Sequence, residues 1–130
     1  MNETRDPDLN EMARTWIAFQ YSDRGSPERS ALALRALAID DLAKKDPHSL
    51  LEVIRIVLQT DTSPKIISNL GAGLIEDLLR ISGQSVISEV EALARSSNVF
   101  RDCLSCTWFH SIDPAIKERI QHTIDSTSDS

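Results

Sequence analysis

Apolar residues recur along most of the chain at steps of three and four, the spacing that puts side chains on one face of an α-helix. Two segments show this spacing plainly: Leu50, Leu51, Ile54, Val57 and Leu58 in one, and Ile116, Ile120 and Ile124 in the other. The chain has only 4 Gly and 5 Pro, too few for the many tight turns of an all-β protein. The pattern therefore predicts an all-α fold built from amphipathic helices.

The five prolines mark places where helices begin. Each follows Asp or Ser, whose side-chain oxygen accepts a hydrogen bond from a free backbone N–H at a helix start. Proline suits the first helical position, because its missing N–H would have no partner there. The five dipeptides are Asp6-Pro7, Ser26-Pro27, Asp46-Pro47, Ser63-Pro64 and Asp113-Pro114. None of these prolines falls inside an apolar periodic segment, so each dipeptide predicts a helix start.

Glycines and caps together predict about seven to eight short helices. We expect them over about 7–21, 27–45, from 46, over 64–70 and 74–82, and from about 86, 98 and 114, with a polar disordered tail over 126–130. Gly71 is expected to end one helix, and Gly73 to cap the next or to let two backbones pack closely. Gly83 is expected to end the helix that follows. The seventh helix should carry Phe100, Cys103, Leu104, Thr107 and Trp108.

The spacing of the helix starts indicates how the helices pack. Prolines at 7, 27 and 47 repeat every 20 residues, so helices joined by short loops should lie antiparallel to their neighbours. Two such helices approach the repeat length of about 40 residues found in HEAT-like solenoids. We therefore expect one domain over residues 1–125, either a HEAT-like α-solenoid or an irregular helical bundle. The segment from Ala31 to Ile39 is apolar nearly all round, which predicts a central position for the second helix.

Residues 70–79, Leu-Gly-Ala-Gly-Leu-Ile-Glu-Asp-Leu-Leu, resemble an uncharacterised family of small bacterial helical proteins. That family has a segment close to Leu-Gly-Ala-Gly-Pro-Leu-Glu-Asp-Leu-Leu, and the likeness extends over roughly residues 13–120. The chain departs from the family at Leu74, where proline is frequent, and at Ser82, where histidine is common. The resemblance implies an α-helical, HEAT-like domain and carries no activity with it.

The charge balance narrows the classes of partner. The chain has 14 Lys and Arg against 20 Asp and Glu, a net charge of -6. Such a surface repels phosphate backbones, so direct nucleic-acid binding is disfavoured and a basic protein surface is the better partner. The N-terminal residues lack the apolar segment of a signal peptide, and no apolar run approaches the roughly 18 residues that span a bilayer. We therefore expect a cytoplasmic protein that does not enter a membrane.

Acidic residues on predicted helix surfaces are the candidate partner-binding groups. They are Asp40, Asp41, Glu76, Asp77, Glu89 and Glu91, with Tyr21 and Phe109 as aromatic anchors near helix ends. They predict a small non-catalytic module that inhibits or neutralises another protein, as immunity proteins and phage counter-defence proteins such as anti-CRISPRs do. The alternative is a self-associating structural protein, a homodimer in which the apolar second helix or the last helix makes the contact.

Two cysteines and a histidine keep a metal-binding or enzymatic alternative open. Cys103, Cys106 and His110 would share one face of a continuous helix, with His122 as a fourth ligand for zinc. Their neighbours are apolar, and a buried cysteine commonly acts as a small hydrophobic residue, which favours a core position. No signature of a catalytic triad or a zinc protease occurs, so the sequence predicts no catalytic residue, cofactor or metal.

Overall fold

The computed structural model describes residues 8–128, and its elements in that range are helices, with no strand among them. The elements are α1 (Leu9–Tyr21), α2 (Pro27–Lys45), α3 (Pro47–Thr60), α4 (Pro64–Leu70), the π-helical turn η1 (Gly71–Ile75), α5 (Glu76–Ser96), α6 (Asn98–Leu104) and α7 (Pro114–Ser128). The all-α prediction is confirmed.

Four of the five predicted helix starts are confirmed by their caps. The Ser26 hydroxyl accepts the Arg29 N–H at 3.1 Å, and Asp46, Ser63 and Asp113 accept backbone N–H groups in the same way. The fifth dipeptide, at residues 6 and 7, lies outside the described residues. The described part of α1 begins instead at Leu9, where the Asp8 carboxylate accepts the Glu11 N–H at 3.1 Å.

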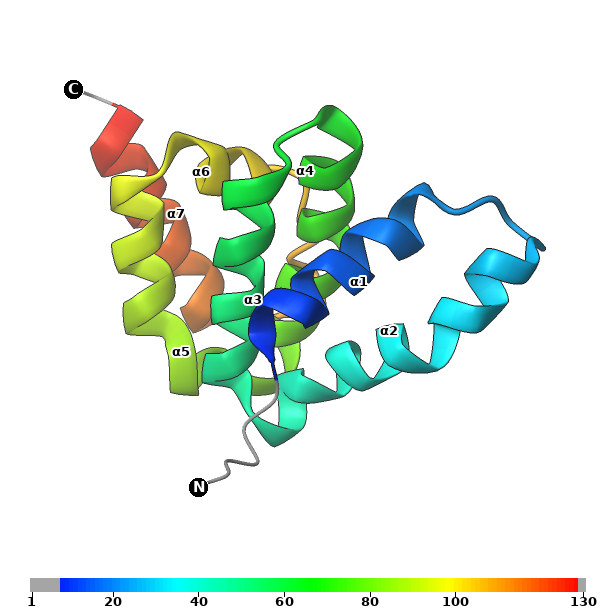
Figure 1. Cartoon of the computed structure of the whole chain (residues 1–130). Coiled ribbons are helices and arrows are strands. Elements are labelled where there is room, and N and C mark those ends of the chain that lie inside the picture. Colours follow the sequence, from blue (N-terminus) through cyan, green and yellow to red (C-terminus); the bar gives the residue numbers. More distant parts are fainter. Residues whose placement is uncertain (1–7, 129–130) are drawn as a thin grey trace, which may run out of the picture.

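Helix α3 lies between an α1–α2 hairpin on one side and the α5–α7 pair on the other (Figure 1). Helix α5 contacts α2, α3, α6 and α7, so packing is not confined to neighbours in a linear stack as in a solenoid. The arrangement is therefore an irregular helical bundle, the second of the two expected architectures. One cluster of buried side chains draws on every helix, with Leu50, Val53, Ile54 and Val57 of α3 fully enclosed.

The expected interruption at Gly71 and Gly73 is wrong, because α4, η1 and α5 follow one another without a gap. The joined helix lowers the count in the described range to six, slightly below the expected seven to eight. Gly71 is present for close packing: a Cβ there would stand 2.1 Å from the Cys103 carbonyl oxygen. The Thr107 hydroxyl donates to the Gly71 carbonyl at 2.8 Å, which ties the π turn to the chain after α6. A glycine does allow two backbones to pack closely here, as one of the two expectations for Gly73 had it, but the glycine that does so is Gly71.

Gly83 does not end a helix either. The backbone of α5 is distorted at Ser82, with φ -134° and ψ 27°, and then continues helically through Gly83 to Ser96. The Ser82 hydroxyl donates to the Ala43 carbonyl at 2.6 Å, so the kink is tied to the end of α2. A Cβ on Gly83 would meet Ile116 of α7 at 3.4 Å. The small residue fits the α5–α7 contact, which the local sequence does not reveal.

Three further boundaries or positions differ from expectation. Helix α2 is peripheral, with Leu34 79% and Leu37 61% exposed, because only one side of it packs on the bundle. The helix expected to carry Trp108 ends at Leu104, where the chain turns, and Trp108 follows in a loop. The C-terminal helix continues through Ser128, so the expected tail is helical over 126–128, and residues 129 and 130 lie outside the described range.

Candidate functional site

Asp40 of α2 lies within range of the charge of Asp77 on α5, and these two helices pack against each other. Asp40 projects from α2 and Asp77 from the first turn of α5. Burial among neighbouring groups raises the pKa of Asp40, and the negative charges of Asp77 and Asp41 raise it further. Within residues 8–128, no hydrogen bond or ion pair engages the Asp40 carboxylate. Asp40 is therefore a crowded carboxylate without a cationic partner in that range.

The loop after α6 presents an exposed aromatic residue beside the start of α5. The Trp108 backbone N–H donates to the Glu76 carboxylate at 3.3 Å, which sets the loop beside the start of α5. The Trp108 side chain is 67% exposed and meets the His110 ring edge-on, with centroids 5.3 Å apart. Sequence reasoning missed Trp108 as a surface residue, because a continuous helix would have turned it toward the core.

We define the acidic face as Asp40, Glu76, Asp77 and Trp108. An Arg80 guanidinium nitrogen lies 3.0 Å from the Asp77 carboxylate, one helical turn away, and is the cation bound there. Exposed ion pairs of this kind contribute little and exchange readily. The face can therefore receive cationic groups from outside, with an indole ring beside them for an apolar or cation–π contact.

The other three predicted acids have partners of their own. Asp41 faces outward on α2, with its carboxylate 3.0 Å from the Lys45 ammonium. Glu89 lies 3.2 Å from the His48 imidazole, and Glu91 receives two hydrogen bonds from Arg119 of α7, at 2.9 and 2.7 Å. Four of the six predicted acids therefore have a local basic partner: Asp41, Asp77, Glu89 and Glu91. Asp40 has none in the described range, and Glu76 accepts the Trp108 N–H.

The two predicted aromatic anchors have structural contacts. The Tyr21 hydroxyl donates to the Asp61 carboxylate at 2.9 Å and lies 2.7 Å from the Ser63 hydroxyl, so it joins the end of α1 to the α3–α4 loop. Phe109 is partly buried against the core cluster, which makes it a packing residue. Trp108, its neighbour, holds the exposed position that was expected for Phe109.

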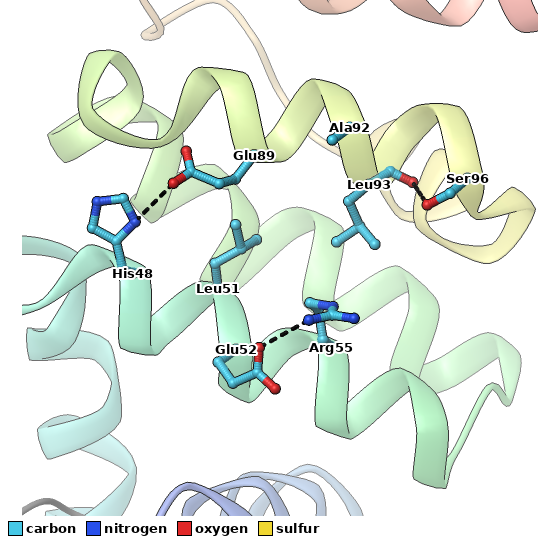
Figure 2. A pocket seen from close by; sticks show the side chains of 8 residues that line it. All are labelled: His48, Leu51, Glu52, Arg55, Glu89, Ala92, Leu93 and Ser96. Atoms are coloured by element: carbon cyan, nitrogen blue, oxygen red, sulfur yellow. Dashed lines mark hydrogen bonds and ion pairs between the residues drawn. The ribbon is translucent and has the colours of Figure 1, made fainter.

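A groove lies between α3 and α5, and the sequence did not predict it. Figure 2 shows His48 and Glu89 paired at one end, Leu51 and Leu93 facing each other, and Arg55 beside Leu93. Its cavity volume is about 330 Å³, and a second hollow shares Arg55 and Leu93 with it. The sequence does contain a pattern that could have indicated this groove. Residues 48, 51, 52 and 55 are spaced by steps of three and four, which places them on one side of α3.

The structure does not have the geometry on which the metal-binding alternative depended. Cys103, Cys106 and His110 do not share a helix, since α6 ends at Leu104. Cys103 is fully buried, and burial raises the pKa of its thiol to about 12, so the thiolate that metals bind is disfavoured. Within residues 8–128, no group of three or more His, Cys, Asp or Glu could hold a metal ion. His122 borders a different hollow, with Glu91 and Arg119.

No helix in the described range is both long and apolar enough to pass through a bilayer.

Comparisons with curated proteins and with solved structures find no match to the chain. A family model does match residues 21–128, which is most of the chain and includes every residue of the acidic face. The chain belongs to a family of unknown function (DUF6869).

Proposed function

We propose that this protein is a small non-catalytic binding module that docks its acidic face on a basic surface of another protein. The observation that supports the proposal is the unfavourable charge interaction of Asp40 with Asp77, from two helices in contact, with no cation on Asp40 in the described range. A fold that needed these carboxylates only for solubility would gain by separating them, since like charges at close range are unfavourable.

A lysine or arginine of a partner would relieve this repulsion. In the free protein the pKa of Asp40 is raised by burial, by Asp77 and by Asp41, so part of its ionisation free energy is lost. A guanidinium placed between Asp40 and Asp77 would favour both charged forms and could bind either carboxylate through two hydrogen bonds. Binding would then lower the pKa of Asp40. The partner would stabilise the charged form of this carboxylate, and that stabilisation exists only in the complex.

Trp108 gives the same face an apolar contact. Tryptophan is enriched among residues that dominate binding energy, and an indole ring also attracts cations over its face. The Trp108 backbone N–H bonds to the Glu76 carboxylate, so this exposed residue lies beside the start of α5. A basic side chain could therefore pair with a carboxylate while its aliphatic stem covers the indole.

The biological role that follows is that of an inhibitor or neutraliser. A domain of net charge -6 is steered toward a basic groove and would compete there with an acidic or nucleic-acid substrate. Immunity functions and phage counter-defence are settings in which small proteins act in this way. Two free thiols suit a reducing compartment, and we place the interaction in the cytoplasm.

The test compares two variants with the same change in charge. Asp40→Asn with Asp77→Asn removes two charges from the acidic face, and Glu28→Gln with Glu118→Gln removes two exposed charges from α2 and α7. Both variants and the wild type are immobilised, exposed to host extract at low salt, and compared by mass spectrometry. The proposal expects a partner held by the wild type and the Gln variant and lost on the Asn variant.

Kinetics on that partner then test the electrostatic argument. The Asn variant should associate about tenfold more slowly than the Gln variant at low salt, since an exposed charge pair contributes up to about 1 kcal/mol. The difference should shrink as salt is added. Equal association rates for the two variants would refute the acidic face as the docking site.

A further inference from the structure

Helix α2 carries a second surface feature that the acidic face does not explain. Ala31, Leu34, Leu37 and Ala38 are exposed, and we call these four residues the leucine face. Ala38 lies at its edge, where it also borders a hollow between α1 and α2. Leu34 is 79% exposed and Leu37 61% exposed, one helical turn apart. Single exposed leucines are ordinary, but two adjacent ones flanked by alanines form a continuous apolar strip that favours contact with another molecule.

The strip is free of charge over nearly three helical turns. Between residues 30 and 38 the charged side chain is Arg35, which turns toward α1 and lines a small hollow with Glu11 and Met12. The charges of α2 lie toward its two ends, where Glu28 and Arg29 precede the strip and Asp40, Asp41, Lys44 and Lys45 follow it. A partner helix can therefore cover the strip without burying a charge.

The charge distribution of the whole chain favours a second copy as the occupant. Helix α2 has three acidic and four basic residues, a balance of +1, which leaves -7 on the rest of the chain. Two acidic molecules repel each other less where surfaces of this balance meet than where acidic surfaces meet. A two-fold interface is also the commonest way for identical chains to associate, because one patch serves both.

We propose that two copies associate through α2, with the helices antiparallel and Leu34 of each opposite Leu37 of the other. Ala31, Leu34 and Ala38 follow the steps of three and four at which helices interlock, and the alanines let the backbones approach. In the antiparallel arrangement the Ser30 end of one helix lies beside the Asp41 end of the other. The helix dipoles then oppose each other, which is the favourable sense.

The size of the strip sets the strength of the contact. The strip spans eight residues, so it is roughly 12 Å long and about 10 Å wide and offers about 120 Å². The whole outward side of the 19-residue helix offers about 300 Å². Stable complexes bury about 800 Å² on each partner. The association should therefore be weak and reversible, with a dissociation constant of roughly 10 µM to 1 mM.

Sedimentation equilibrium over this concentration range tests the proposal. The wild type should be monomeric at low concentration and dimeric at high concentration, and Leu34→Glu with Leu37→Glu should weaken association at least tenfold. Ile81→Glu is the matched control, since Ile81 is an exposed apolar residue on α5, and it should dimerise as the wild type does. Circular dichroism verifies that each variant keeps its helix content.

A charge-swap variant tests the orientation. Leu34→Lys combined with Leu37→Glu places opposite charges across an antiparallel contact and like charges across a parallel one. Association of this variant, together with a monomeric double-Glu variant, supports the antiparallel pair. A wild type that stays monomeric to about 1 mM, a double-Glu variant that associates normally, or a charge-swap variant that stays monomeric would overturn it. These residues are not part of the acidic face, so either proposal can fail alone.

Discussion

At the scale of single residues, Gly71 shows how one missing Cβ positions a neighbouring helix. Its ideal Cβ would stand 2.1 Å from the Cys103 carbonyl oxygen and 2.8 Å from the Cys106 Cβ. The first of these is backbone and cannot turn aside, so Gly71→Ala should push the end of α6 outward. We expect a loss of about 2–3 kcal/mol in the free energy of unfolding, measured in urea.

Gly73 is the control for this substitution, two residues along the same π turn. Nothing lies within 4 Å of its ideal Cβ, and its φ is not positive. Gly73→Ala should therefore stabilise the protein by about 0.5–1 kcal/mol, because alanine restricts the unfolded chain more than glycine does. Similar effects of the two substitutions would show that the contact with α6 is not what requires glycine at 71.

Two aspartates should respond to pH in opposite directions. The raised pKa of Asp40 means that its ionisation opposes folding, so Asp40→Asn should stabilise the protein at pH 7, by about 0.5 kcal/mol at most at this exposed position. The gain should fade as pH drops through the raised pKa and vanish below the ordinary value of 3.8, where Asp40 is protonated in both the folded and the unfolded chain. Urea unfolding of wild type and variant across that range measures the difference.

Replacing Asp61 should change the free energy of unfolding in the opposite direction. The Ser63 backbone N–H holds its pKa below the ordinary value, and the hydroxyls of Tyr21 and Ser63 lower it further. Its ionised form therefore stabilises the fold above pH 3.8, and this contribution is lost as pH falls through the lowered pKa. Asp61→Asn should destabilise the protein at neutral pH and have progressively less effect in acid. A stabilising effect of Asp61→Asn at pH 7 would contradict the hydrogen-bond assignment.

At the scale of elements, a buried hydrogen bond joins the π turn to the loop after α6. The Thr107 hydroxyl, on a buried side chain, donates to the Gly71 carbonyl at 2.8 Å. Thr107→Val keeps the shape but leaves that carbonyl without this donor, so we expect a loss of about 1–2 kcal/mol in urea unfolding. Thr107→Ser retains the hydroxyl and should lose less. If Thr107→Ser costs more than Thr107→Val, the methyl group and not the hydrogen bond is what matters.

Helix starts could be predicted from the sequence, whereas continuations through glycine could not. A cap such as Ser26 acts on N–H groups two or three residues away, so the information is local. Gly71 and Gly83 look like helix ends by the same local rules, yet each packs against a distant segment. The end of α6 leaves no room for a Cβ on Gly71, and Ile116 would lie in contact with a Cβ on Gly83. The exposure of Leu34 has a similar origin, since no segment of the bundle covers that side of α2.

The acidic face could be predicted in part, and the reason is again distance along the chain. Glu76 and Asp77 are neighbours, so their shared surface was visible in the sequence. The approach of Asp40 to Asp77 depends on the packing of α2 against α5, and the exposure of Trp108 depends on where α6 stops. The local sequence spacing contains neither of these facts. The sequence therefore favours Phe109 over Trp108 as the exposed aromatic residue.

At the scale of the whole molecule, the two proposed contacts should respond to salt in opposite directions. Two copies that each carry a charge of -6 repel at long range, so added salt should strengthen association through α2. A basic partner is attracted to the acidic face, so the same salt should weaken that complex. Raising ionic strength from about 0.02 M to about 0.5 M, which shortens the screening length from roughly 20 Å to roughly 4 Å, should separate the two. Sedimentation measures the first contact and association kinetics the second. If salt weakens both, charge attraction also holds the copies together, and the apolar account of the leucine face is wrong.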